Sequence, residues 1–217
     1  MNADYGGVEV LIPYARAGEL RRRALSFVLA FYADWFPAWK LTIATDEEQP
    51  FNRGRALNQA VASFATEIVV INDADALCDQ AQVLEAVRLA REAPGYVFAY
   101  TLYLRLSEHV TAALADYIEA LEAPAEWGMV NAPSGSCSAI RRDDYRRIGG
   151  FDERFAGWGY EDLEWNMRCD RYANGCRRVP GELRHLWHGD RRPDDSPLSA
   201  DPVDVARNWQ LYRELVA

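Results

Sequence analysis

The strongest constraint on the fold is the alternation of short apolar runs with amphipathic segments over the first 92 residues. Runs with the length and composition of buried strands lie at 8–12, 41–44 and 67–72, and segments with helical spacing of apolar side chains lie at 18–36, 53–64 and 79–92. Strands that alternate with helices in this way build a doubly wound sheet. The sequence therefore predicts an α/β fold with a Rossmann-like sheet and helices on both faces.

The second half of the chain alternates less regularly. We expect strands at 96–106, 136–141 and 182–188 and helices at 107–122, 160–172 and 203–216. The stretch from Gly189 to Pro202 is rich in Asp, Arg, Pro and Ser, which predicts a mobile loop. This loop is either a lid over a bound substrate or a plain connector to the last helix. We therefore expect one domain at residues 1–188, with the loop and a C-terminal helix at 189–217 packed on that same domain.

The balance of charge argues against a general binder of polyanions. The chain has 24 Lys and Arg against 33 Asp and Glu, a net charge of -9. Residues 141–192 are the exception, with twelve Arg and ten acidic residues, so a local anion-binding face stays open. No run approaches the roughly 20 apolar residues of a membrane span, and the first residues lack the layout of a signal peptide. We expect no membrane span and a cytoplasmic location.

Two carboxylates, Asp73 and Asp75, flank Ala74 directly after the apolar run 67–72. Ligands of open α/β sheets collect at the carboxyl ends of the strands, so both side chains are expected at the binding crevice. Oxygen ligands suit Mn²⁺ or Mg²⁺, which in turn hold the diphosphate of a substrate. The alternative is an acidic turn that caps the next helix.

Four motifs follow one another along the chain. They are Phe51-Asn52-Arg53-Gly54-Arg55-Ala56-Leu57-Asn58, Asp73-Ala74-Asp75, Gly149-Gly150-Phe151-Asp152-Glu153 and Trp158-Gly159-Tyr160-Glu161-Asp162-Leu163-Glu164. The series resembles the inverting GT-A glycosyltransferases related to the β4-galactosyltransferases and to the bacterial chondroitin-polymerase type. The resemblance covers most of residues 8–188, and the Trp-Gly-x-Glu-Asp motif is its specific part. It implies a GT-A nucleotide-sugar-binding sheet and a UDP-sugar donor.

The resemblance also implies roles for single residues. Phe51, Asn52 and Arg53 would contact the uridine, and Asp73 the ribose or sugar hydroxyls. The full set expected around the donor is Pro13, Tyr14, Arg16, Asp46, Phe51, Asn52, Arg53, Asn58, Asp73, Ala74, Asp75, Trp158 and Gly159. Trp158 would offer a flat apolar surface to a sugar face, although a large aromatic side chain is more often part of the core.

The predicted late strand, with Arg184-His185-Leu186-Trp187-His188, supplies the remaining metal ligands that the resemblance implies. Several relatives place two ligands three residues apart on the matching strand, where this chain has His185 and His188. The metal site would then be Asp75, His185 and His188, a combination of carboxylate and imidazole that suits Mn²⁺. The alternative for His185 is a merely packed or exposed side chain.

Sugar transfer with inversion needs a base for the acceptor hydroxyl and positive charge for the departing nucleoside diphosphate. The metal supplies the charge. Among the carboxylates of the last motif, Asp162 is the candidate base and Glu161 would hold a neighbouring hydroxyl. Both also suit the acidic first turn of a helix, where they interact favourably with its dipole. Related retaining N-acetylgalactosaminyltransferases tend to carry Asn at the position of Asp162, so the Asp favours inversion.

Other functions share some of these features. A transferase acting on modified bases in DNA would use Arg side chains to follow the backbone, namely Arg141, Arg142, Arg146, Arg147, Arg177, Arg178, Arg191 and Arg192. A retaining N-acetylgalactosaminyltransferase-like enzyme is a further alternative. A nucleotidyltransferase would need a better phosphate loop than residues 13–18, and a carbohydrate-binding module would not need the metal ligands. We therefore expect a hydroxyl acceptor on a glycan, a glycoconjugate or a modified nucleic-acid base.

Overall fold

The computed structural model describes residues 6–15, 18–48, 50–132, 135–157, 159–173, 175–188 and 202–216. In the first half of the chain the elements are β1 (Val8–Pro13), α1 (Glu19–Trp35), β2 (Lys40–Ala44), α2 (Arg53–Ala62), β3 (Ile68–Asn72), β4 (Ala76–Cys78), α3 (Gln80–Glu92), β5 (Val97–Phe98) and β6 (Leu102–Arg105). In the second half they are α4 (Glu108–Ala113), α5 (Tyr117–Glu122), β7 (Trp127–Val130), β8 (Cys137–Arg141), α6 (Arg142–Ile148), α7 (Glu161–Ala173), β9 (Arg177–Arg178), β10 (Glu182–His185) and α8 (Pro202–Val216).

The strands form two sheets. The main sheet has six strands in the order β2-β1-β3-β8-β5-β9, and the smaller one has four in the order β4-β10-β6-β7. In the main sheet β1 is parallel to β2 and β3, while β8 runs antiparallel to β3. Every residue of β1 and β3 is buried, as the continuous apolar runs require for strands covered on both faces. The carboxyl end of β3 therefore leads directly from the core to the Asp73–Asp75 turn.

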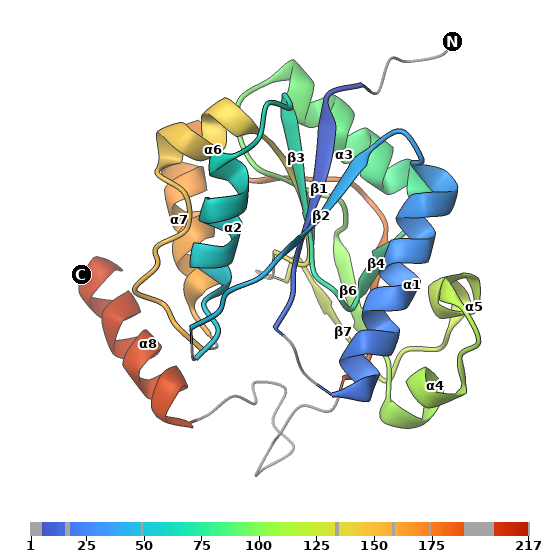
Figure 1. Ribbon diagram of the computed structural model, residues 1–217. Helices are drawn as coiled ribbons and strands as arrows, with labels where there is room; N and C mark the ends of the chain where they lie inside the picture. The colour runs from blue at the N-terminus through green and yellow to red at the C-terminus, as the bar shows by residue number, and fades with distance from the viewer. Residues whose placement is uncertain are drawn as a thin grey trace.

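Helices cover the main sheet on both sides. Figure 1 shows α1 and α3 on one side and α2, α6 and α7 on the other, with the smaller sheet below and α8 at the margin. The buried faces of these helices and the strands between them form one continuous core. The predicted α/β fold with helices on both faces is confirmed.

One predicted strand is divided between the sheets. Residues 96–106 were expected to be continuous, but β5 pairs with β8 and β9 in the main sheet, whereas β6 pairs with β10 and β7 in the smaller one. The backbone N–H groups of Thr101 and Leu102 both donate to the carbonyl of Gly181 at the crossing point. Pairing with different partners on either side of this point breaks the strand, which an apolar pattern alone does not reveal.

The predicted helix 107–122 is likewise two short helices. Ser107 caps α4 by accepting from the N–H of Val110, and Asp116 caps α5 by accepting from the N–H of Glu119. A second capping side chain inside an apolar pattern starts a new helix instead of continuing the old one. The short elements β4, β7, α6 and β9 were not predicted, and β10 is shorter than the predicted strand 182–188.

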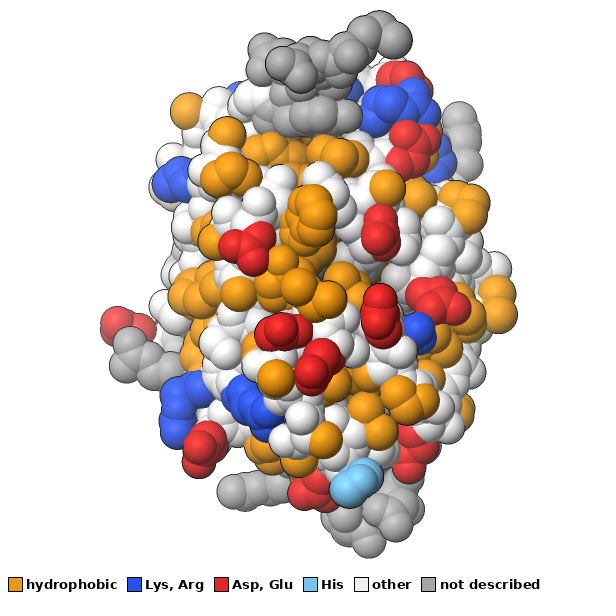
Figure 2. Space-filling view, turned by 90° about the vertical axis from the view of Figure 1, so that its right-hand side faces the viewer, with side chains coloured by type: hydrophobic (Ala, Val, Ile, Leu, Met, Phe, Trp, Pro, Cys, Tyr) orange, Lys and Arg blue, Asp and Glu red, His pale blue; other side chains and the backbone are white. Residues whose placement is uncertain are grey.

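Among the described residues, the side that carries α1, α4 and α5 has no continuous basic face. Figure 2 shows Asp and Glu side chains scattered over an apolar middle there, with few Lys and Arg. None of the helices in the described part of the chain is long and apolar enough to cross a membrane.

Candidate active site

Asp75, His185 and His188 converge at the junction of the two sheets. Asp75 immediately precedes β4, and β4 runs antiparallel to β10 with Ala76 opposite His185. The N–H of Leu186 donates to the Asp75 carbonyl at 2.8 Å, which extends the ladder by one bond. Residues 110 positions apart in the sequence are thus fixed side by side by backbone hydrogen bonds.

The side chains of these three residues point at one another. His185 Nε2 lies 3.4 Å from Asp75 Oδ1, and His188 Nε2 lies 3.3 Å from Asp75 Oδ2. One ligand atom from each residue falls within 4.8 Å of the other two, which is the spacing of ligands around one metal ion. Burial would raise the pKa of the Asp75 carboxyl, but His185, His188 and Arg21 outweigh burial and lower it. The carboxylate is therefore ionised at neutral pH, as a metal ligand must be.

Arg21 is a site residue that the sequence analysis missed. It lies in the first turn of α1, and its Nη2 is 3.5 Å from His188 Nε2. A guanidinium beside the metal ligands adds positive charge where a diphosphate would bind. The sequence gives no signal for this role, because Arg21 is the first of three consecutive arginines on one helix.

Arg53 connects the Asp73–Asp75 turn to the Glu161–Asp162 pair. Its Nη2 donates to Asp73 Oδ1 at 2.9 Å, and its Nη1 donates to Asp162 Oδ1 at 3.2 Å. The guanidinium is largely buried and also lies over the ring of Phe151. One cation therefore holds two carboxylates from distant motifs in a shared arrangement.

Glu161 and Asp162 open α7, and Asp162 faces Arg53. Burial raises the pKa of both carboxyls, that of Glu161 to about 7. Arg53 opposes this rise at both residues by favouring the charged form. Asp162 also accepts a hydrogen bond from the backbone of Gly135. A Cβ atom at Gly135 would lie 2.8 Å from Asp162 Oδ1, so any other residue at position 135 would displace this carboxylate.

The raised pKa of Glu161 makes stability depend on pH. Its pKa of about 7 in the folded state exceeds the ordinary glutamate value of 4.5. The stability that the protonated carboxyl contributes is therefore complete below pH 4.5 and is lost as the pH rises through 7. Glu161→Gln mimics the protonated form and should raise the free energy of unfolding on the order of 2 kcal/mol at pH 8 but little at pH 4.5.

Urea unfolding at both pH values, with chelator present, measures this difference. The exposed Glu126→Gln variant controls for the loss of one charge. An equal effect of Glu161→Gln at the two pH values would contradict the raised pKa.

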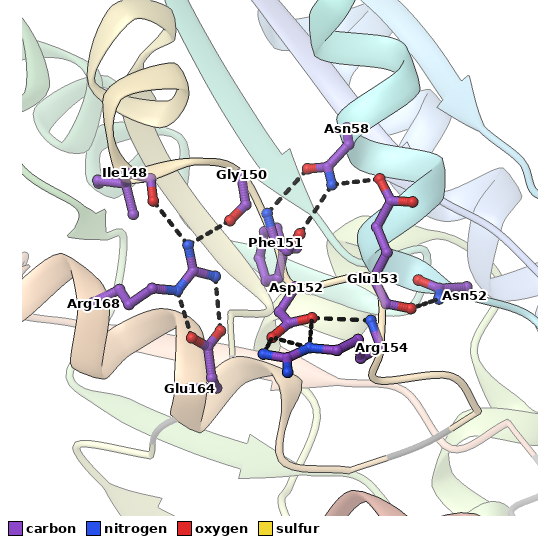
Figure 3. Close-up of polar contacts among 10 residues, drawn as sticks. All are labelled: Asn52, Asn58, Ile148, Gly150, Phe151, Asp152, Glu153, Arg154, Glu164 and Arg168. Carbon is purple, nitrogen blue, oxygen red and sulfur yellow. Dashed lines mark hydrogen bonds and ion pairs between the residues drawn. The ribbon is translucent and has the colours of Figure 1, made fainter. Parts of the chain in front are cut away.

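Two of the motifs bind each other. All four hydrogen-bonding positions of the Asn58 amide are used: Nδ2 donates to the Phe151 carbonyl and to Glu153 Oε1, while Oδ1 accepts from the Phe151 N–H and the Tyr145 hydroxyl. Figure 3 shows Asn58 of α2 reaching the segment of residues 150–153. These contacts favour a structural role for Asn58, and its predicted contact with the donor remains a prediction.

The same segment is tied to α7. Arg168 donates to the carbonyls of Ile148 and Gly150 and pairs with Glu164, as Figure 3 shows. Phe151 stacks on Trp165 with ring centroids 4.5 Å apart. The Gly-Gly-Phe-Asp-Glu motif is thus the support between α2, which carries Arg53, and α7, which carries Asp162.

The residues predicted to contact uridine lie together at the start of α2. Asn52 caps the helix by accepting from the Arg55 N–H, and its Nδ2 donates to the Glu153 carbonyl. Asp46 pairs with Arg55 at 2.7 Å and accepts from the Asn52 N–H. The Arg55 contact lowers the pKa of Asp46. The side chains of Asn52 and Asp46 therefore make internal contacts that fix the loop between β2 and α2.

The other predicted donor residues are placed as follows. Pro13 ends β1, and the Tyr14 N–H donates to the Ala44 carbonyl, so both lie beside the end of β2. Phe51 is half-buried, Ala74 is buried in the Asp73–Asp75 turn, and Gly159 has a φ of 103° before α7. Arg16, Trp158 and residues 189–201 of the predicted lid lie outside the described residues, while Pro202, the last residue of that predicted loop, begins α8.

The arginines proposed to follow a nucleic-acid backbone are used within the protein. Arg141, Arg142 and Arg146 donate to main-chain carbonyls, as do Arg177 and Arg178, and Arg147 interacts with the Tyr172 hydroxyl. Arg191 and Arg192 are outside the described residues. These contacts favour a structural role for the six described arginines over a role in DNA binding.

Comparison with known proteins agrees with the motifs. Residues 129–190 match the family model described as the N-terminal domain of galactosyltransferase. Human chondroitin sulfate N-acetylgalactosaminyltransferase 2 is 29% identical over 167 residues. The aligned region covers 70% of this chain but only 29% of that relative. The chain is thus a distant relative of these enzymes and spans less than a third of the length of the human protein.

Solved structures identify the fold. A Drosophila β1,4-galactosyltransferase 7 mutant in complex with manganese, UDP-Gal and xylobiose has a TM-score of 0.54 at 15% identity, covering 88% of this chain and 66% of that one. A Pyrobaculum calidifontis mannosyltransferase in complex with GDP-Man and Mn²⁺ has a TM-score of 0.53 at 20% identity, covering 86% and 58%. Both confirm the predicted GT-A fold.

Proposed function

Because the chain has the GT-A fold and is related to the galactosyltransferases, we propose that it is a metal-dependent glycosyltransferase. It would transfer a sugar from a UDP-sugar to a hydroxyl acceptor with inversion of configuration. The observation that carries this proposal is the position of Arg53, which contacts Asp73 on the metal side and Asp162 on the acceptor side. A donor held by the metal residues would therefore meet an acceptor held by Glu161 and Asp162.

The residues present fit a divalent cation. Asp75 is buried and ionised, and two imidazoles lie within reach of the same point. Asp75, His185 and His188 would hold the ion, and imidazole ligands favour Mn²⁺ over Mg²⁺. The ion, when bound, neutralises the charge that develops on the departing diphosphate.

The protein residues complete the transfer chemistry. Asp162 accepts the proton of the attacking hydroxyl, while Arg53 and the Gly135 N–H hold its carboxylate in place. Glu161, with a pKa of about 7, both donates to and accepts from a neighbouring acceptor hydroxyl near neutral pH. Direct attack on the anomeric carbon from the face opposite the diphosphate inverts the configuration. A glycan or glycoconjugate acceptor agrees best with the internal use of the surface arginines.

The choice of nucleotide is the first point to test. One structural neighbour is in complex with UDP-Gal and another with GDP-Man, so the fold is compatible with either base. With Mn²⁺ present, we expect calorimetry to show UDP binding at least about tenfold more tightly than GDP, a difference of about 1.4 kcal/mol. Titration with chelator present is the control. Equal affinity, or a preference for GDP, would exclude UDP-sugars as the donors.

A further inference from the structure

The residue that introduces the acceptor-side carboxylates has an unusual backbone conformation. Tyr160 has a φ of 71°, in the left-handed region that a bulky residue rarely adopts. Its carbonyl accepts the N–H of Glu164, the first hydrogen bond of α7. The direction in which Glu161 and Asp162 leave the turn therefore depends on what keeps Tyr160 in this conformation.

Aromatic side chains of α8 contact the Tyr160 ring. The ring centroid of Tyr160 lies 5.2 Å from that of Trp209 and 5.7 Å from that of Tyr212. Trp209 and Tyr212 also stack on each other, with an angle of 22° between their rings. Trp209 and Tyr212 belong to α8, and Tyr160 immediately precedes α7. The three-ring cluster therefore joins α8 to the turn before α7.

Polar contacts from α8 hold the other end of the same turn. Asn208, fully buried, donates from Nδ2 to the Ala156 carbonyl at 3.1 Å, and Arg207 donates to the same carbonyl. Gly157 has a φ of 77°, and a Cβ atom there would clash with the Asp204 side chain. The Gly157 N–H donates to the Phe51 carbonyl at 3.0 Å, which links the turn to the start of α2.

We propose that α8 is a clasp that positions Glu161 and Asp162 for the transfer step. The clasp consists of Asp204, Asn208, Trp209 and Tyr212 on α8, which hold Ala156, Gly157 and Tyr160. Tyr160 and Trp209 are positioning residues in this account, since they act through the carboxylates. The proposal rests on the proposed glycosyltransferase function, because it concerns the geometry of that reaction.

Variants of the full chain separate positioning from other roles. Trp209→Ala and Tyr160→Gly each remove a ring of the cluster, and Gly keeps the left-handed backbone accessible. We expect both to lower kcat about 10- to 100-fold, the size of effect that misplacement of catalytic groups produces, with UDP affinity in Mn²⁺ unchanged. Tyr160→Phe keeps the ring and should retain near-normal kcat. Gln210→Ala, at an exposed position beside Trp209, is the matched control.

Hydrogen exchange gives a readout that does not depend on activity. Trp209→Ala and Tyr160→Gly should speed exchange of the Glu164 N–H, which is bonded to the Tyr160 carbonyl, while the β1 and β3 amides stay protected. A wild-type chain without transferase activity would refute the proposed function, but exchange would still test the clasp.

Two results would overturn the proposal. One is an active wild-type enzyme whose Trp209→Ala variant matches Gln210→Ala in kcat and in exchange at Glu164. The other is a raised acceptor KM with unchanged kcat in Trp209→Ala, which would identify a surface that stacks on acceptor sugars instead of a clasp.

Discussion

Replacing Asp162 by Asn is expected to lower kcat by roughly 10²–10⁴-fold, because the amide cannot accept the proton of the acceptor hydroxyl. The variant keeps the size of the side chain and an oxygen that accepts from Arg53 Nη1. Donor affinity should therefore change little. Initial rates at saturating donor and acceptor, together with UDP calorimetry, separate the two quantities.

The neighbouring carboxylate gives the matched control for this prediction. Glu161 and Asp162 are adjacent on α7 and point about 100° apart, so only one can face the reacting hydroxyl. Glu161→Gln should mainly raise the acceptor KM. The anomer provides an independent check, since an α-linked donor should give a β-linked product. A retained α linkage, or near-normal kcat in Asp162→Asn, would contradict Asp162 as the base.

Replacing a metal ligand is the second change with a large expected effect. Asp75→Asn and His188→Ala should each weaken Mn²⁺ binding by more than about 100-fold, since loss of groups that only support metal ligands already costs about 10- to 100-fold. Each variant removes one of the three candidate ligands that the described residues provide, Asp75, His185 and His188. Calorimetry with Mn²⁺ measures the loss without requiring turnover.

The third histidine of the chain controls for a general effect of removing imidazole. His109 is exposed on α4 and does not belong to the Asp75, His185 and His188 cluster, so His109→Ala should bind Mn²⁺ as the wild type does. Chelator should abolish turnover and added Mn²⁺ should restore it. Full activity in excess chelator would contradict a metal-dependent reaction.

The parts of the fold that could be predicted are those with a local signal. The short apolar runs at 8–12 and 67–72 were sufficient to predict strands, and the structure buries every residue of β1 and β3. The division of residues 96–106 between two sheets depends on pairing with β8 and β10, which lie far away in the sequence. Such long-range pairing leaves no mark on the pattern of the strand itself.

The candidate site shows the same limit. The resemblance of the motifs was sufficient to propose Asp75, His185 and His188, which the structure brings together. The motifs gave no sign that Asn58 binds the Phe151 main chain. A polar residue in a motif has the same sequence pattern whether its side chain contacts a ligand or the backbone. Gly135 and Arg21 were missed since their roles arise only when the loop before β8 and the helix α1 are folded.

The most direct test of the central claim is release of UDP from a panel of UDP-sugars incubated with the wild-type chain, Mn²⁺ and glycan acceptors. The account predicts UDP release and a new β-linked product with at least one α-linked donor, abolished by chelator and nearly abolished in Asp162→Asn. UDP release with no dependence on the metal, or sugar transfer only from GDP-sugars, would contradict it.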